Sequence, residues 1–181
     1  MLIQLFRSTG ESDMKLNLGC GDQKMDGYTN VDLHGSPDVR CDLMIFPWPW
    51  GDNTIGEVYM CHFLEHVTDL EKTLLEIHRI LKPEGIIHFR VPHYRSPFAI
   101  WHLHRWSFSV YTPRLLCMKV PFQFGGKHLF KEKSLRINFA YRKILAKPLE
   151  FLANFFPLLW DWAGLPISEI EFVGIKVSEK E

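Results

Sequence analysis

The sequence predicts an α/β fold built on a mostly parallel sheet, and two stretches carry this prediction. Residues 15–32 read as a short apolar strand, a glycine turn and a second strand that ends in Asp32. Residues 57–92 read as a strand, an amphipathic helix and another strand, which is the order that builds parallel sheets. With 181 residues, of which 46% are hydrophobic and 23% charged, the chain can form one domain with a sizeable core.

The first predicted strand, residues 15–18, runs into Gly19-Cys20-Gly21. Glycine permits the positive φ of a tight turn and lets a ligand approach the backbone closely. Asp32 lies in the second predicted strand, residues 29–33, where a carboxylate can accept hydrogen bonds from a ribose. We interpret the stretch as a nucleoside-binding edge, with a plain glycine turn between two strands as the alternative.

The nucleoside is not expected to be a dinucleotide. A dinucleotide fingerprint has a third glycine and a full helix before the acid. Here Lys24 stands in the place of the third glycine, and Asp32 follows too soon for a full helix. A cofactor that has a ribose and an adenine but no phosphate suits these residues better.

The elements up to residue 61 follow in order after a turn-rich lead-in over residues 1–13. A turn at Gly35-Ser36-Pro37 leads into residues 38–43. Residues 46–50, which read FPWPW, form an aromatic and proline-rich corner that we expect to pack on the sheet. The next strand, over residues 57–61, delivers His62 to the edge where open α/β sheets bind ligands.

The next helix is predicted by a capping box, Thr68-x-x-Glu71, and by apolar residues at helical spacing. Lys82-Pro83-Glu84-Gly85 ends this helix, and a strand follows over residues 85–92. A long loop rich in aromatic and basic residues, 93–112, comes next. Because long loops in compact domains are usually functional, we interpret it as a substrate lid over the same edge.

The C-terminal third contains two alternating stretches, 135–145 and 169–177, which predict strands. Between them lies a highly apolar segment, residues 149–162. The connection from Gly21 to Asp32 leaves one face of the sheet near the first strand poorly covered, and we expect this segment to cover it. The alternative is a helix that contacts a membrane surface or a partner beside the basic block.

Four motifs in register resemble those of a known family: LNLGCGDQKMDGYTNVDL at 16–33, CDLM at 41–44, FLEHV at 63–67 and LKPEGIIHFRVP at 81–92. They are similar to motifs of the class I S-adenosylmethionine-dependent methyltransferases, and most similar to the small type 11 group. The resemblance implies a doubly wound, mostly parallel Rossmann-like methyltransferase sheet with an antiparallel strand at the C-terminal end. It implies a single domain over residues 1–181, with a flexible lead-in at 1–13 and a lid and basic insertion at 93–134.

The resemblance also implies methyl transfer from S-adenosylmethionine. The residues that it assigns to the cofactor are Asn17, Gly19, Cys20, Gly21, Asp32, Leu33, Asp42, Leu43 and His62. Many members of the family carry an acid in the place of Asn17, whose amide can accept a hydrogen bond but has no charge. For Asp42, the capping of a local turn is the alternative role.

The candidates for a general base are His62, Glu65, His66 and His104, with His93 and His102 as further histidines of the lid. Some O-methyltransferases of this class hold a divalent metal with E-x-x-E-H and a later histidine. Here the same positions read His62-x-x-Glu65-His66, and His104 could be the later ligand. Such a set suits zinc, iron or manganese. We leave the metal open without favouring it, and structural bracing of the helix is the alternative for Glu65 and His66.

The formal net charge is zero, but residues 114–147 hold nine Lys and Arg against one acid. This block suits an anionic acceptor, and we expect a small-molecule or glycan-like one. One alternative is a non-catalytic scaffold that binds the cofactor. A less favoured alternative, a nucleic-acid methyltransferase, would use Lys127, Lys131, Lys133, Arg136, Arg142 and Lys143.

Cysteine spacing and hydropathy predict a cytoplasmic protein. The four cysteines show no short paired spacing of the zinc or redox kind, which fits reduced thiols. No run of 18 apolar residues occurs, and the apolar start, MLIQLF, is too short for a signal-peptide core. Peripheral membrane contact through residues 149–162 is not favoured, and the oligomeric state is left open.

Overall fold

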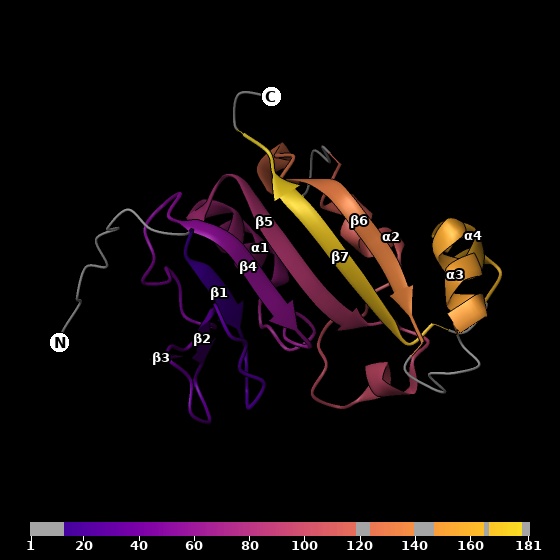
Figure 1. The fold of residues 1–181 in the computed structure, drawn as a ribbon, viewed down its shortest axis with the longest axis horizontal. Coiled ribbons are helices and arrows are strands. Elements are labelled where there is room, and N and C mark those ends of the chain that lie inside the picture. Colours follow the sequence, from indigo (N-terminus) through magenta and orange to yellow (C-terminus); the bar gives the residue numbers. More distant parts are fainter. Residues whose placement is uncertain (1–12, 119–123, 140–146, 165–166, 179–181) are drawn as a thin grey trace.

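The computed structural model describes residues 13–118, 124–139, 147–164 and 167–178. Within these ranges, seven strands form one sheet in the order β3-β2-β1-β4-β5-β7-β6 (Figure 1). The strands are β1 (Lys15–Leu18), β2 (Thr29–Asp32), β3 (Val39–Arg40), β4 (Ile55–Cys61), β5 (Leu81–Pro92), β6 (Phe130–Asn138) and β7 (Glu169–Lys176). Strands β1 to β5 pair in parallel, whereas β7 is antiparallel to β5 and β6. The predicted mostly parallel sheet with an antiparallel strand near its C-terminal end is confirmed.

Within the described ranges the α-helices are fewer than the strands. They are α1 (Leu70–Ile80), α2 (Tyr111–Leu115), α3 (Lys147–Phe155) and α4 (Pro157–Trp162), with the 3₁₀ turns η1 (Pro97–Ile100) and η2 (Phe124–Gly126). Helix α1 is the crossover between β4 and β5. Its side chains Leu74, Ile77 and Ile80 are buried in the core, and each such side chain contributes about 1.5–3 kcal/mol through burial.

The start of α1 differs from the predicted capping box. The side chain of Asp69, not that of Thr68, accepts a hydrogen bond from Lys72 N at 3.0 Å. Glu71 does not close the box either, because its Oε1 accepts a hydrogen bond from Phe124 N at 2.9 Å. A carboxylate is a strong cap acceptor, so the first turn begins one residue later than the sequence pattern indicated.

The structure also tests two other predicted elements, the aromatic corner and the strand predicted at residues 135–145. Trp48 and Trp50 of the aromatic corner are buried, which confirms that the corner packs on the core. Strand β6 begins earlier than the predicted 135–145 because its pairing with β7 starts at Phe130 opposite Lys176. It ends at Asn138, and residues 140–145 of that prediction lie outside the described residues.

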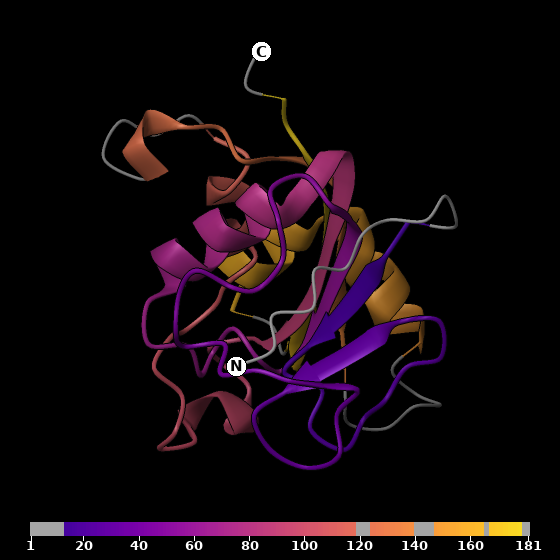
Figure 2. The same ribbon diagram turned by 90° about the vertical axis from the view of Figure 1, so that its left-hand side faces the viewer.

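One face of the sheet carries little helical cover. Buried residues such as Val58, Ile87 and Phe172 alternate along the strands with half-buried polar ones such as His88 and Glu171. Of the described helices, α1 and α2 lie behind the sheet in Figure 1, and none crosses its near face over β1, β4 and β5 (Figures 1 and 2).

The apolar segment 149–162 does not cover that face, so this expectation was wrong. It forms α3 and α4, which lie beside β6, at the end of the sheet away from β1 (Figure 1). Hydrogen bonds from polar side chains of α3 determine this position. Asn154 Oδ1 accepts a hydrogen bond from Ile137 N and Glu150 Oε1 accepts one from Phe139 N, both at 2.7 Å. These side chains satisfy the backbone of a strand edge that would otherwise stay unpaired.

Candidate active site

The glycine turn after β1 is fixed against β2. Both Gly19 N and Cys20 N donate to Val31 O, at 2.9 and 3.2 Å. Gly19 has φ of +66° and Gly21 has φ of +50°. A Cβ at Gly19 would lie 2.3 Å from the ring of Phe63, so only glycine fits there. A Cβ at Gly21 would meet no atom within 4 Å, so the backbone of Gly21 is open to a ligand.

Asp32 lies against this turn, as the sequence predicted. Its Oδ2 accepts a hydrogen bond from Gly21 N at 2.8 Å, and its Oδ1 accepts one from His34 N at 2.9 Å. Each carboxylate oxygen still has an acceptor site, because an ionised carboxylate can accept about four hydrogen bonds. A fixed carboxylate next to an open glycine fits the two hydroxyl groups of a ribose.

Asn17 braces the turn from inside. Its side chain is buried and its Nδ2 donates to Gln23 O and to Asn30 Oδ1, both at 2.9 Å. Asn30 in turn accepts from Met25 N at 2.8 Å. The amide therefore holds the connection from β1 to β2 in shape, and a contact between Asn17 and the cofactor stays a prediction.

Three further residues that the resemblance assigns to the cofactor differ in exposure. Asp42 Oδ1 accepts a hydrogen bond from Met44 N at 2.9 Å, so Asp42 does cap a local turn. Leu43 is buried and its carbonyl accepts a hydrogen bond from Trp48 Nε1. Leu33, in contrast, is 40% exposed. Of the three, only the Leu33 side chain stands open at the rim beside Asp32.

His62, directly after β4, lies between two carboxylates. Its Nδ1 is 3.1 Å from Glu65 Oε1, and its Nε2 is 3.0 Å from Glu169 Oε1. Hydrogen bonds to Glu169 and then to Glu65 raise the pKa of His62 to about 10. The bond from His62 and the pairing with Arg90 lower the pKa of Glu169 to about 2. His62 is therefore an imidazolium near neutral pH.

Glu65 joins this ion pair to a second cluster. The residue is fully buried, and its Oε2 has no hydrogen-bond partner among the described residues. Ligand atoms of Glu65, His66 and His104 lie within 4.8 Å of one another, and the rings of His66 and His104 are 4.7 Å apart. His104 Nδ1 is likewise buried without a partner in the described part of the chain. Three of the four predicted catalytic residues are thus brought together, and His62 borders them.

The loop that follows β5 lies on this cluster. Arg105 N donates to Glu65 O at 2.7 Å, and Trp106 Nε1 donates to Val67 O at 2.7 Å. The ring of Trp101 packs against His66 at 5.8 Å and against His104 at 5.6 Å. The predicted lid therefore contacts the loop after β4, at the carboxyl edge of the sheet.

The two remaining histidines of the lid are not in the cluster. His93 is fully buried, with its Nε2 3.2 Å from Asp161 Oδ1, and burial lowers its pKa. His102 is exposed and packs on Trp101 at 5.9 Å.

Glu169 is a site residue that the sequence patterns did not reveal. It begins the antiparallel strand β7, which places it at the same edge as the carboxyl ends of β4 and β5. Its pairing with Arg90 and His62 spans 79 and 107 positions of the chain. The only signal available was an acid at the start of a strand predicted to run antiparallel.

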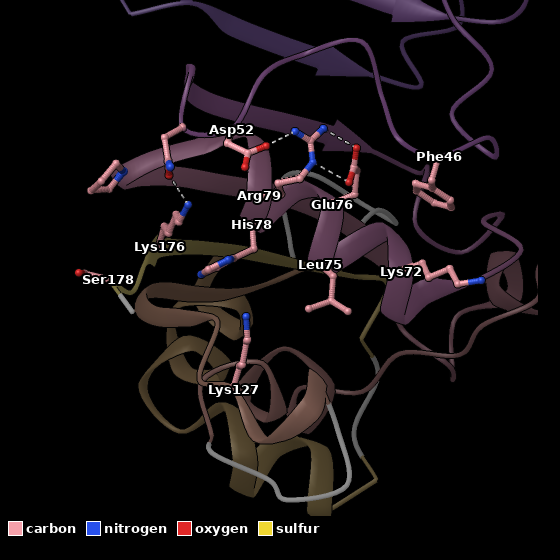
Figure 3. A pocket seen from close by; sticks show the side chains of 12 residues that line it. Phe46, Asp52, Lys72, Leu75, Glu76, His78, Arg79, Lys127, Lys176 and Ser178 are labelled. Atoms are coloured by element: carbon pink, nitrogen blue, oxygen red, sulfur yellow. Dashed lines mark hydrogen bonds and ion pairs between the residues drawn. The ribbon is translucent and has the colours of Figure 1, made fainter. Parts of the chain in front are cut away.

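A cavity of about 620 Å³ lies elsewhere in the molecule (Figure 3). Its lining includes Asn53 before β4 and Lys176 at the end of β7, where Lys176 Nζ donates to Asn53 Oδ1 at 2.7 Å. Arg79 bridges Glu76 and Asp52 on its wall. None of the predicted cofactor or catalytic residues lines it, so its size alone does not make it the active site.

Comparisons with known proteins concern the family and the fold. Residues 30–89 match the family model described as a methyltransferase domain. A comparison with curated proteins found no match.

Solved structures share the fold at low sequence identity. An S-adenosylmethionine-dependent methyltransferase from Archaeoglobus fulgidus is 14% identical, with a TM-score of 0.63 over 91% of this chain and 86% of that one. One from Mesorhizobium loti is 18% identical, with a TM-score of 0.52 over 90% of each chain. A geranyl diphosphate methyltransferase solved with S-adenosylmethionine is 10% identical, with a TM-score of 0.57 over 91% of this chain and 78% of that one.

The strand order and the single reversed strand define the class I methyltransferase fold. Residues 30–89 are thus similar to a methyltransferase domain, and the chain shares its fold with S-adenosylmethionine-dependent methyltransferases. The open backbone of Gly21 and the fixed carboxylate of Asp32 are compatible with the ribose of such a cofactor.

Proposed function

We propose that the chain transfers a methyl group from S-adenosylmethionine to a small-molecule or glycan-like acceptor that binds between the loop after β4 and the lid. The observation that supports this most is the cluster of buried Glu65 with the half-buried His66 and His104, which the lid contacts through Arg105 and Trp106. The cluster lies at the same sheet edge as the glycine turn, because Phe63 of the same loop packs on Gly19.

The cofactor end of the site consists of the residues around the glycine turn. When bound, S-adenosylmethionine supplies an activated methyl group on a sulfonium. Asp32 accepts hydrogen bonds from ribose hydroxyls, and Gly19 to Gly21 offer an open backbone. Leu33 covers a face of the adenine from the exposed rim. Asn17 and Asp42 act mainly by holding the turns that carry these groups.

The acceptor end consists of the carboxylate and the two imidazoles. Glu65 is a buried carboxyl group beside the rings of His66 and His104, with ligand atoms of the three within 4.8 Å of one another. An imidazole held in this way takes the proton from an acceptor hydroxyl or amine as the new bond to the methyl carbon forms. His62 does not serve as this base, because its pKa of about 10 keeps it protonated. As a cation, His62 instead holds the side chain of Glu65 in place through the contact between His62 Nδ1 and Glu65 Oε1.

The acceptor cluster is tested with Glu65→Gln and His104→Asn. Methyl transfer from radiolabelled S-adenosylmethionine is measured against pools of small hydroxylated, amine and glycan acceptors. We expect each variant to lower kcat by about 10²–10⁴ while cofactor affinity stays unchanged. Glu84→Gln, which changes an exposed glutamate outside the site, is the matched control. Equal kcat in Glu65→Gln and wild type would overturn the assignment.

A metal-dependent version of the same reaction is the second candidate, and the short distances between the ligand atoms of Glu65, His66 and His104 support it. Two imidazoles and one carboxylate with ligand atoms within 4.8 Å suit zinc, iron or manganese. Activity that survives chelation supports proton transfer by the imidazoles alone. Activity that is lost with a chelator and restored by one of these metals assigns the cluster to a metal.

Two other functions give different results in the same assays. A scaffold would bind the cofactor and methylate none of the acceptors. A nucleic-acid methyltransferase would bind nucleic acid with an affinity that falls steeply with salt. Its described candidate contacts include Lys131, Lys133 and Arg136 on β6, which is three strands away from β4 in the sheet order.

A further inference from the structure

In the helical hairpin of α3 and α4, helix α3 has its polar side turned toward the protein, whereas α4 packs Leu158 and Trp160 against the core. Asn154 Nδ2 donates to Ile137 O at 3.0 Å, in addition to the bonds that Asn154 and Glu150 accept from the edge of β6. Ala153 is fully buried between them. The inward side of α3 therefore consists of two polar residues and a methyl group. A helix on a water-exposed surface normally has the opposite arrangement.

The outward side of the hairpin is apolar, and we call it the hairpin face. On α3 and just after it, the exposed residues are Leu149, Phe151, Leu152, Phe155 and Phe156. On α4 they are Leu159 and Trp162. These seven side chains are 49–79% exposed, and the rings of Phe151 and Phe155 lie 5.1 Å apart. A contiguous apolar face of this kind marks a surface that contacts something other than water.

The charges around the hairpin face are positive. Among the described residues between positions 93 and 164, eight are Lys or Arg and three are Asp or Glu. All three acids are used inside the protein: Glu132 pairs with Arg114, Glu150 binds Phe139 N, and Asp161 binds Val110 N. Two exposed basic residues adjoin the hairpin: Lys147 begins α3, and Arg136 precedes Ile137, whose backbone binds Asn154. Lys131 and Lys133 are exposed farther along the same strand.

From these observations we propose that the hairpin face docks on an anionic lipid surface. Exposed Phe, Leu and Trp on a helix bordered by Lys and Arg are the composition of helices that lie in the membrane interface. Anionic head groups match the basic border, whereas a second copy of this chain would bring the same positive charges together. The docking is peripheral, since no helix in the described ranges is long and apolar enough to cross a membrane.

The hairpin is connected to the edge of the active site. Oδ1 of Asp161 in α4 lies 3.2 Å from Nε2 of His93, the residue that follows β5. Oδ2 of Asp161 accepts a hydrogen bond from Val110 N, also at 3.2 Å. Its backbone oxygen accepts a hydrogen bond from Arg95 at 2.8 Å. These contacts fix α4 to both ends of the lid segment. A protein docked through the hairpin face therefore holds its lid near the lipid surface.

The test is co-sedimentation of the full chain with sucrose-loaded vesicles. Vesicles of phosphatidylcholine with about 30% phosphatidylglycerol are compared with vesicles of phosphatidylcholine alone. We expect binding to the anionic vesicles that weakens at least about tenfold in the double variant Phe151→Ser/Phe155→Ser. The triple variant Lys131→Gln/Lys133→Gln/Arg136→Gln is expected to weaken binding by a similar factor and to lose the dependence on salt.

The controls separate a lost surface from a lost fold. Ile45→Ser changes a residue that is exposed to the same degree as Phe151 but follows β3, and it is expected to bind vesicles like the wild type. Circular dichroism checks that each variant is folded. The proposal is overturned if the wild type does not bind anionic vesicles, or if Phe151→Ser/Phe155→Ser binds them equally well. It is also overturned if light scattering shows a dimer that the double variant abolishes, because the face would then belong to a second copy.

Discussion

The Nε2 atom of His62 lies 3.0 Å from the Oε1 atom of Glu169, although the two residues are 107 positions apart in the sequence. The contact joins the loop after β4 to the start of the antiparallel strand β7. Through its other nitrogen, His62 also binds Glu65 at the acceptor cluster. One protonated imidazole thus connects the reversed strand of the sheet with the buried carboxylate of the site.

This ion pair makes stability depend on pH in a defined window. The pKa of His62 is raised from 6.5 to about 10, so its contribution is complete below pH 6.5 and is lost as the pH rises through 10. The pKa of Glu169 is lowered from 4.5 to about 2, so its contribution is complete above pH 4.5 and is lost as the pH falls through 2. The pair therefore stabilises the fold most between pH 4.5 and 6.5.

We expect His62→Gln to remove the alkaline part of this dependence. Because the His62 side chain is 39% exposed, solvent screening limits the expected effect to about 1 kcal/mol. Urea unfolding of wild type and variant is compared at about pH 6 and pH 10, and the difference in unfolding free energy should shrink at the higher pH. A difference that is the same at both values would contradict the assignment of a protonated His62.

The two glycines of the turn should respond differently to alanine. Gly19→Ala places a methyl group against the Phe63 ring and forces alanine to a φ of +66°, so it should destabilise the fold. The left-handed backbone alone costs about 1–2 kcal/mol, and the clash adds to it. Gly21→Ala meets no atom of the protein, so it should cost about 1 kcal/mol of stability from the backbone and mainly weaken cofactor binding.

Thermal unfolding and calorimetry with S-adenosylhomocysteine distinguish these two effects. The interpretation predicts the larger loss of stability for Gly19→Ala. A folded Gly21→Ala variant that binds the ligand as tightly as the wild type would show that the ligand does not approach this turn.

The hydrogen bond from Trp106 Nε1 to Val67 O is expected to position the lid. Trp106→Phe keeps the aromatic ring and removes the donor, which should cost about 1 kcal/mol of lid docking. We expect KM for the acceptor to rise several-fold while cofactor affinity is unchanged, and limited proteolysis within residues 94–106 should become faster. Tyr111→Phe, at an exposed position of the same segment, is the control. If KM for the acceptor and the rate of proteolysis were unchanged in Trp106→Phe, the assignment of the lid to the acceptor site would be contradicted.

Much of the fold was predictable because several of its strands and helices depend on residues that are close together in the sequence. The run from Lys15 to Leu18 followed by the glycine turn predicted β1 with its observed bounds, and the helical spacing of Leu70, Leu74 and Ile77 predicted α1. The neighbourhood of Gly21 and Asp32 also follows from local order, since two adjacent parallel strands end at the same edge.

The features that were missed depend on contacts between distant segments. Glu169 reaches the site only because β7 runs antiparallel next to β5. The apolar segment 149–162 was expected to cover the bare face of the sheet, since burial of its aromatic residues is the usual outcome. Its position is instead determined by the hydrogen bonds of Glu150 and Asn154 to the edge of β6, which its apolar pattern does not reveal.

The most direct test of the central claim is isothermal titration calorimetry of the full chain with S-adenosylmethionine. We predict binding at one site per chain that is weakened about 10- to 100-fold by Asp32→Ala, because the variant loses charged acceptors for the ribose hydroxyls. Asp26→Asn, an exposed aspartate of the same connection, should bind like the wild type. Absence of binding in the wild type, or equal affinity in Asp32→Ala, would contradict the placement of the cofactor at the glycine turn.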